Sequence, residues 1–352
     1  TMINRQSELE KLLEVLRVAA WVALDTEADS LHAYPEKVCL LQLQYDRQPV
    51  LVDPLAGMDC APLFAVLRRP ELILHGADYD LRLLHRSYGF VPTQVFDTML
   101  AARLAGHRQF SLADLLSHYQ GITLEKGPQT ANWARRPLTD RMDAYARNDV
   151  RFLKPLADHL RADLQRQGRL AWHREACTRL VAECTQPRPR DPDRVWRLPG
   201  CDRLDRRGLG VLRELWHWRE QEALRRNRPP YFVLSHETLL ALAAAATQGR
   251  APDALFPRRF PPAARQAVTA VMARSLALAA AQQPERVRPP RHRSTPAEMQ
   301  RFDEFKKKRD HHAHALGIDP ALIASRATLV LLARDGSALQ TELMEWQRQL
   351  LS

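Results

Sequence analysis

Acidic side chains stand at three places in the first half of the chain where the surrounding pattern calls for apolar residues. Asp25 and Glu27 end one apolar run, and Asp80 follows another. Asp149 lies in the apolar stripe of an expected helix, one turn after Tyr145. Charge on a buried face is costly unless it is neutralised, and converging carboxylates repel one another unless divalent cations lie between them. The pattern therefore predicts a two-metal site, a type of site that cuts phosphodiesters.

Each motif has a structural alternative when it is considered alone. A strand over residues 21–27 would project Asp25 and Glu27 from one face, where one carboxylate can bridge two cations, although many strands simply end in acidic turns. Asp80 opens an expected helix and could instead stabilise the helix dipole. A buried aspartate beside a tyrosine needs either a metal or a structural hydrogen bond, so Asp149 leaves both open. The occurrence of all three motifs in one domain favours the metal site.

The segments around these acids alternate between strand-like and helix-like patterns. We expect strands over residues 21–27, 38–45, 48–53, 72–75 and 95–98, and helices over residues 7–16, 62–67, 80–87 and along the stretch that contains Asp149. Strands that come first and then alternate with helices are typical of an α/β sheet domain. Such a sheet can bring together acids that are far apart in the sequence.

Two proline-rich breaks, at residues 186–193 and 284–296, divide the rest of the chain. The pattern before and after the second break is helical and repeats with a shift of 90 residues. Arg219 and Arg309, for example, occupy equivalent positions in the two copies. Two copies of one small helical domain explain the repeat, and chance similarity of Leu- and Ala-rich helices is the alternative. We expect an α/β domain at 1–165, a helical and proline-rich linker at 166–200, a helical domain at 201–283, a basic proline-rich linker at 284–294 and a second helical domain at 295–352.

The net charge of +11 is unevenly distributed over the 352 residues. Residues 1–165 carry 19 Lys and Arg against 21 Asp and Glu, whereas residues 166–352 carry 33 against 20. A basic second half beside a near-neutral first half indicates a catalytic part and a part that holds a polyanion, with an Arg-rich proteome as the alternative. The polar first residues, the lack of a long apolar run and five cysteines without a Cys-x-x-Cys spacing predict a cytoplasmic protein with reduced thiols and no membrane partner.

Taken together, the motifs resemble the DEDD superfamily of 3′-to-5′ exonucleases. Asp25 with Glu27 matches its first motif and Asp80 its second, and Tyr145 with Asp149 matches the tyrosine form of its third. More narrowly, the segments at residues 111–115 and 124–139 resemble the ribonuclease D family, and the two helical repeats resemble its HRDC domains. The resemblance covers nearly the whole chain. It implies a ribonuclease H-like exonuclease domain with a mixed sheet flanked by helices, followed by two small all-α bundles.

The resemblance also implies a role for each acid. Asp25 would bridge two Mg²⁺ or Mn²⁺ ions, Glu27 and Asp149 would hold the ion that activates water, and Asp80 would support the second ion. Tyr145 would orient the water, because a tyrosine with a pKa near 10 is a poor base at neutral pH. The products would be 5′-monophosphates removed from a free 3′ end.

Three further residues lie between the second and third motifs and could contact the substrate: Lys126, Trp133 and Arg136. An aromatic side chain among basic ones can stack a base and meet phosphates, and packing of Trp133 on the core is the equally weighted alternative.

By resemblance, the expected substrates are tRNA precursors and other structured RNAs with 3′ extensions, and a monomer is expected. One alternative is a nuclease that acts on single-stranded DNA, since the catalytic acids do not read the 2′-hydroxyl. The other is an RNA-binding scaffold whose nuclease fold has decayed, although the intact acids argue against it.

Overall fold

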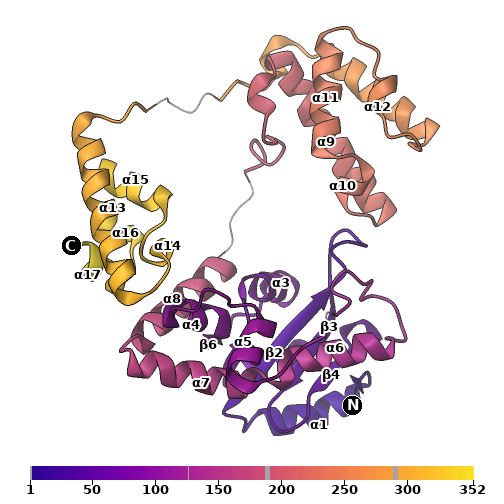
Figure 1. Cartoon of the computed structure of the whole chain (residues 1–352). Helices are drawn as coiled ribbons and strands as arrows, with labels where there is room; N and C mark the ends of the chain where they lie inside the picture. Colours follow the sequence, from indigo (N-terminus) through magenta and orange to yellow (C-terminus); the bar gives the residue numbers. More distant parts are fainter. Residues whose placement is uncertain (1, 126, 187–190, 288–291) are drawn as a thin grey trace. The chain divides into compact units, whose positions relative to one another are not determined.

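The protein is described by a computed structural model that covers residues 2–125, 127–186, 191–287 and 292–352 (Figure 1). The chain forms two units. The first contains Thr1–Ala28, Val38–Gln186 and Arg293–Ser352, and the second contains Asp29–Lys37 and Pro187–His292. Within the described residues, none of the helices is both long and apolar enough to cross a membrane.

Six strands of the first unit form one mixed sheet in the order β1-β4-β3-β2-β5-β6 (Figure 1). The strands are β1 (Met2–Ile3), β2 (Trp21–Ala28), β3 (Val38–Gln44), β4 (Val50–Val52), β5 (Glu71–Leu74) and β6 (Gln94–Asp97). Strand β2 is antiparallel to β3 and parallel to β5. The five expected strands are therefore present with ends that differ by a few residues, and the prediction of an α/β domain with a mixed sheet is confirmed; the short β1 was not expected.

Helices cover both faces of this sheet. They are α1 (Gln6–Leu16), α2 (Ala61–Leu67), α3 (Asp78–Tyr88), α4 (Thr98–Ala105), α5 (Leu112–Gln120), α6 (Asp140–Arg151), α7 (Leu153–Arg166) and α8 (Leu170–Thr185). Side chains of β2 alternate between two cores, as the two-residue period of a strand requires. Ala23 packs with α4, α5 and α7, whereas Val22 and Leu24 pack with α1, α2 and α3.

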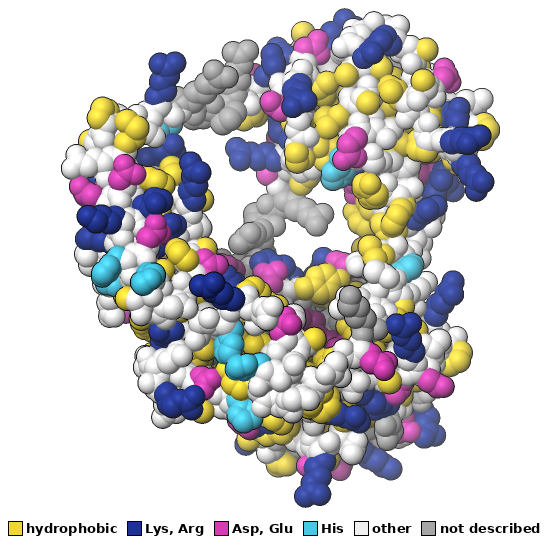
Figure 2. Space-filling view, in the orientation of Figure 1, with side chains coloured by type: hydrophobic (Ala, Val, Ile, Leu, Met, Phe, Trp, Pro, Cys, Tyr) yellow, Lys and Arg dark blue, Asp and Glu magenta, His cyan; other side chains and the backbone are white. Residues whose placement is uncertain are grey.

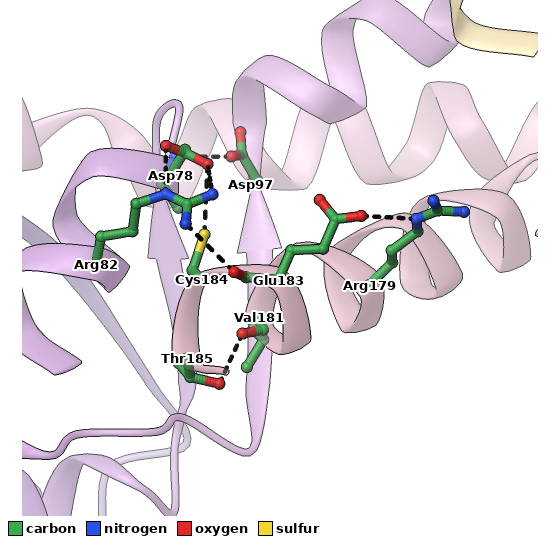
Figure 3. Close-up of polar contacts among 9 residues, drawn as sticks. Asp78, Arg82, Asp97, Arg179, Val181, Glu183, Cys184 and Thr185 are labelled. Atoms are coloured by element: carbon green, nitrogen blue, oxygen red, sulfur yellow. Dashed lines mark hydrogen bonds and ion pairs between the residues drawn. The ribbon is translucent and has the colours of Figure 1, made fainter. Parts of the chain in front are cut away.

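Helix α8 lies in the stretch predicted as a helical and proline-rich linker, and it belongs to the first unit (Figure 3). Asp78 of α3 forms an ion pair with Arg82 at 2.8 Å and accepts a hydrogen bond from the thiol of Cys184 at 3.4 Å. Arg82 also donates to the carbonyl oxygen of Glu183 at 3.3 Å. These contacts fasten the end of α8 to α3, so α8 packs with the sheet domain within the first unit.

Two helical regions follow, and their first elements are offset by 90 residues. Helices α9 (Arg206–Arg226), α10 (Pro230–Val233), α11 (His236–Thr247) and α12 (Pro262–Leu276) belong to the second unit, and α13 (Pro296–Leu316), α14 (Pro320–Ile323), α15 (Arg326–Arg334), α16 (Ala338–Glu342) and α17 (Glu345–Leu351) to the first. Short 3₁₀ helices lie at Pro54–Ala56, Cys201–Arg203, Asp253–Leu255 and Ala280–Gln282.

The offset extends to individual contacts. Arg219 donates to the carbonyl oxygen of Leu234 at 3.4 Å, and Arg309 donates to that of Ala324, also 90 residues further on, at 3.2 Å. Thr295 opens α13 with a capping box to Glu298.

The α13–α17 region shares a core with the sheet domain. The rings of Trp172 and Trp346 stack with centroids 4.8 Å apart. Arg169 joins the two parts by donating to the carbonyl oxygens of Leu104 and Leu316, each at 2.7 Å. The region is therefore packed against the sheet domain as part of the first unit.

Candidate active site

Strand β2 and helix α6 bring three carboxylates together. Asp25 and Glu27 project from the same face of β2, and a bulge directly after Glu27 ends the regular pairing with β3. Helix α6 begins at the cap formed by Thr139, whose hydroxyl accepts from the Met142 N–H at 3.2 Å, and it places Asp149 beside β2. One carboxylate oxygen from each of Asp25, Glu27 and Asp149 lies within 4.8 Å of the others. We call these three residues the carboxylate cluster.

Asp80 is close to this cluster but is held differently. It lies in the first turn of α3, is buried, and accepts a hydrogen bond from the Thr26 hydroxyl at 2.5 Å. Its charge nevertheless raises the pKa of both Asp25 and Glu27. Within the described residues, Asp80 is thus a charged neighbour of the cluster and not one of its converging ligand atoms.

Burial and mutual repulsion make it costly for these acids to ionise. Burial is the main cause that raises the pKa of Glu27 to about 9 and that of Asp149 to about 7. Burial also raises the pKa of Asp25 well above its ordinary value, and the charges of Asp80, Asp149 and Glu27 raise it further. Burial raises the pKa of Asp80 to about 6, although the hydrogen bond from Thr26 lowers it. At neutral pH, full ionisation of the group requires a compensating positive charge.

Two buried polar groups at the site lack a hydrogen-bond partner in the described part of the chain. One is the Oδ2 atom of Asp149, and the other is the side-chain amide of Gln42, which is fully buried. Gln42 pairs with Asp25 across β2 and β3, so the two side chains point from the same face. Buried polar groups are rarely left unsatisfied, so hard cations with their bound water fit this donor set. Gln42 could not be predicted from the sequence, because only the strand register places it beside Asp25.

Tyr145 lies one turn before Asp149 and forms a hydrogen bond that lowers the pKa of that carboxyl. Burial and the charge of Asp149 raise the pKa of Tyr145 itself, so its hydroxyl stays protonated at neutral pH. The backbone at Gly127 covers the Tyr145 ring so closely that a Cβ atom there would come 1.6 Å from Cδ2. Gln129 from the same loop also hydrogen-bonds to Tyr145. Neither loop residue was singled out from the sequence.

The three residues predicted to contact substrate have different positions. Lys126 lies outside the described residues. Trp133 is 1% exposed and packs with Met142 and Ala146, so of the two alternatives for this residue the structure favours core packing. Stacking of a substrate base on this indole would require Trp133 to leave this packed position, and it stays a prediction.

Arg136 is occupied by contacts within the protein. Its guanidinium forms a bidentate ion pair with Asp53, with both distances at 2.6 Å, and donates to the carbonyl oxygens of Cys39 and Trp133 at 2.7 and 2.8 Å. The predicted phosphate contact would require these bonds to break, so in this conformation Arg136 supports the loop.

Comparisons with known proteins indicate the family of the chain. A family model described as 3′-5′ exonuclease matches residues 1–165, and one described as HRDC domain matches residues 208–250. A ribonuclease D of Gluconacetobacter diazotrophicus is 36% identical over 70% of this chain, and the match spans 63% of that relative's length. A ribonuclease D of Pseudomonas paraeruginosa is 30% identical over 99% of this chain and 94% of its own.

Solved structures give the same picture. The chain resembles Escherichia coli RNase D, described as an exoribonuclease involved in structured RNA processing, with a TM-score of 0.77 and 25% identity over 100% of this chain and 98% of that one. It also resembles the catalytic core of RRP6 from Trypanosoma brucei, with a TM-score of 0.66 and 25% identity over 78% and 79% of the two chains. From its full-length match to a curated relative, its exonuclease and HRDC domains and its likeness to RNase D, the chain belongs to the ribonuclease D family.

Proposed function

We propose that the protein is a metal-dependent 3′-to-5′ exoribonuclease that releases 5′-monophosphates. The observation that carries this proposal is the carboxylate cluster, where Asp25, Glu27 and Asp149 converge within 4.8 Å with raised pKa values. Such a cluster is poorly stable without cations. Metal binding therefore explains why acids and not apolar residues occupy these positions.

Asp25, Glu27 and Asp149 would hold two divalent cations, Mg²⁺ or Mn²⁺. When bound, these ions neutralise the phosphate, lower the pKa of water and stabilise the leaving oxygen. Asp80 adds negative charge beside the cluster and would act through water, since its carboxylate is bonded to Thr26. Tyr145, which stays protonated, would orient the attacking water by its hydroxyl and would not remove a proton.

The proposed substrates are structured RNAs with a 3′ extension, tRNA precursors among them. The names of the relatives and the net charge of +13 on residues 166–352 support an RNA substrate. The 90-residue offset and the matched contacts of Arg219 and Arg309 support our further proposal that α13–α17 is a second, HRDC-like copy. A monomer in the cytoplasm stays our prediction.

The direct test is incubation of the protein with a 3′-extended tRNA in Mg²⁺, in Mn²⁺ and in EDTA. We expect shortening by single nucleotides and release of 5′-monophosphates only when metal is present. Asp149→Asn should abolish this activity, whereas Asp158→Asn, an exposed acid of α7 paired with Lys154, should retain it. Full activity of Asp149→Asn would reject the assignment. A matched DNA oligonucleotide in the same assay decides between RNA and the alternative of single-stranded DNA.

A further inference from the structure

A cavity of about 520 Å³ lies in the first unit where the C-terminal ends of α4 and α13 meet. We call it the α4–α13 pocket. The two helix ends touch there, because a Cβ atom on Gly106 would come 2.9 Å from the carbonyl oxygen of Gly317. The side chains that line the pocket include Arg103, His107, Arg108, Phe110, His314 and Asp319. None of its lining residues belongs to the carboxylate cluster, and its size is in the range of small-ligand sites.

Cations near a helix C-terminus often serve only to satisfy its last carbonyl groups. The last carbonyls of α4 already have donors. Leu104 accepts from Arg169, Ala105 accepts from the side chain of Gln167 at 3.1 Å, and the preceding two accept from backbone N–H groups. Arg103 and Arg108 are therefore not needed as caps.

The two arginines also lack an acidic partner in the described part of the chain, although ion pairs are common elsewhere on this protein. Asp319, the acid that lines the pocket, accepts from the Ala321 N–H as the cap of α14. Arg103 lies over the ring of Phe110 at 5.5 Å. Two available guanidinium groups beside an aromatic ring form a surface that suits a phosphate and a base.

His107 adds a hydrogen-bond acceptor to this surface. The Tyr119 hydroxyl donates to Asp163 at 2.5 Å, so it presents a lone pair to Nε2 of His107, 2.7 Å away. Nε2 must then carry the proton, and Nδ1 is left as an acceptor. Burial and the nearby His118 lower the pKa of His107, which keeps the ring neutral at pH 7. Figure 2 shows histidine side chains gathered on the drawn face of the nuclease body, beside Lys and Arg.

We propose that the α4–α13 pocket binds one nucleotide segment of the substrate RNA, apart from the carboxylate cluster. The phosphates contact Arg103 and Arg108, the base stacks on Phe110 or on the guanidinium above it, and Nδ1 of His107 accepts from a ribose hydroxyl or a base amino group. This inference rests on the proposed function only in that the bound strand is taken to be the enzyme's substrate.

The test measures RNA binding without turnover, in the full chain carrying Asp149→Asn and in EDTA. Binding of a fluorescent single-stranded RNA is followed over a range of salt concentrations. Arg103→Gln/Arg108→Gln should bind roughly tenfold more weakly, with a salt-dependence slope smaller by about 1.4, because each phosphate contact on a single strand contributes about 0.7. Arg47→Gln/Arg68→Gln removes the same charge from exposed positions outside the pocket and should change neither quantity as strongly.

Two further measurements keep the result interpretable. With Asp149 intact, Arg103→Gln/Arg108→Gln should hydrolyse thymidine 5′-monophosphate p-nitrophenyl ester as the unchanged protein does, because this ester carries a single phosphodiester and none of the pocket's lining residues belongs to the carboxylate cluster. If the double variant unfolds, Arg108→Gln alone should lower the salt slope by about 0.7.

Equal RNA affinity and equal salt slopes in the pocket and control variants would overturn the proposal. So would loss of 5′-AMP binding in the pocket variant with RNA binding unchanged, because the ligand would then be a free nucleotide. Failure of the protein to digest RNA would reject the proposed function and leave the binding result standing.

Discussion

The backbone of Gly127 lies directly on the ring of Tyr145, with room for a hydrogen atom but not for a methyl group. A Cβ atom at this position would come within 1.6 to 2.5 Å of three ring carbons of Tyr145. Since Tyr145 is hydrogen-bonded to Asp149, the loop that contains Gly127 fixes the tyrosine against the carboxylate cluster.

Gly127→Ala should therefore displace the tyrosine ring without changing any ligand atom. We expect kcat on RNA to fall by about 100-fold, as small misplacements of catalytic groups do. Overpacking should lower the free energy of unfolding by about 1–3 kcal/mol. Gly336→Ala is the matched control, because nothing lies within 4 Å of a Cβ there and its φ is not positive. Unchanged kcat in Gly127→Ala would show that the ring does not need this loop.

Gln42 is expected to support the site through its buried amide. In Gln42→Met the side chain keeps a similar volume but loses both polar atoms. Because neither atom has a partner in the described structure, metal-free stability should be unchanged or should rise by about 1–2 kcal/mol. We expect kcat to fall roughly tenfold if the amide holds Asp25 or metal-bound water in place.

The control for this experiment is Gln44→Met, two residues further along β3. The side chain of Gln44 donates to the carbonyl oxygen of Asp46 at 2.9 Å, so the change should cost stability and leave kcat unaltered. Full activity of Gln42→Met would assign its amide no part in the reaction.

The carboxylate cluster should also connect stability to pH when metal is absent. The raised pKa values of Glu27, about 9, and Asp149, about 7, mean that the folded state retains protons that the unfolded state releases. The stabilising contribution is fully present below the unfolded pKa near 4 and is lost as pH rises through the folded values. In EDTA, the free energy of unfolding should fall between pH 5 and 9 by several kcal/mol, on the order of 5 kcal/mol from Glu27 alone.

Urea unfolding at each pH measures this effect, and saturating Mg²⁺ should restore the lost stability. His75 and His173 contribute in the opposite sense, because burial lowers the pKa of both rings and acid then favours the unfolded state. Subtraction of the curve for Glu27→Gln cancels their contribution. A wild-type curve parallel to that of Glu27→Gln would contradict the prediction.

Local patterns were sufficient to find the acids of the site. The two-residue period of β2 places Asp25 and Glu27 on one face, and the stripe of α6 puts Tyr145 and Asp149 one turn apart. Both rules need only neighbouring residues. The sequence could therefore predict which side chains project from each element, and an α/β sheet was enough to suggest that they meet.

Contacts between distant segments could not be predicted in this way. Nothing in the local sequence pairs Gln42 with Asp25, which depends on the register of two strands. The contact between Cys184 and Asp78 that fastens α8 to α3, and the stack of Trp172 on Trp346, also join residues far apart in the chain. The composition near residue 166 is that of an ordinary helix before a proline-rich break, so it gives no sign that α8 packs within the first unit.

Arg136 shows how such a contact changes the interpretation of a basic residue, and it supplies the last prediction. Arg136→Ala leaves the buried Asp53 without its bidentate partner and should lower the free energy of unfolding by about 3–5 kcal/mol. Arg136→Lys should recover only part of this stability, because an ammonium group cannot replace the two parallel bonds. Urea unfolding measures both losses.

RNA affinity separates this structural role from a phosphate contact. With Asp149→Asn present and metal removed, the folded Arg136→Lys protein should bind RNA as tightly as its parent. Only the stability of the variant should change, because in the parent protein the Arg136 guanidinium donates its hydrogen bonds to Asp53, Cys39 and Trp133. Weaker RNA binding with unchanged stability would contradict the structural role and show that Arg136 contacts the substrate. Only a side chain that is free to leave Asp53 can reach a phosphate.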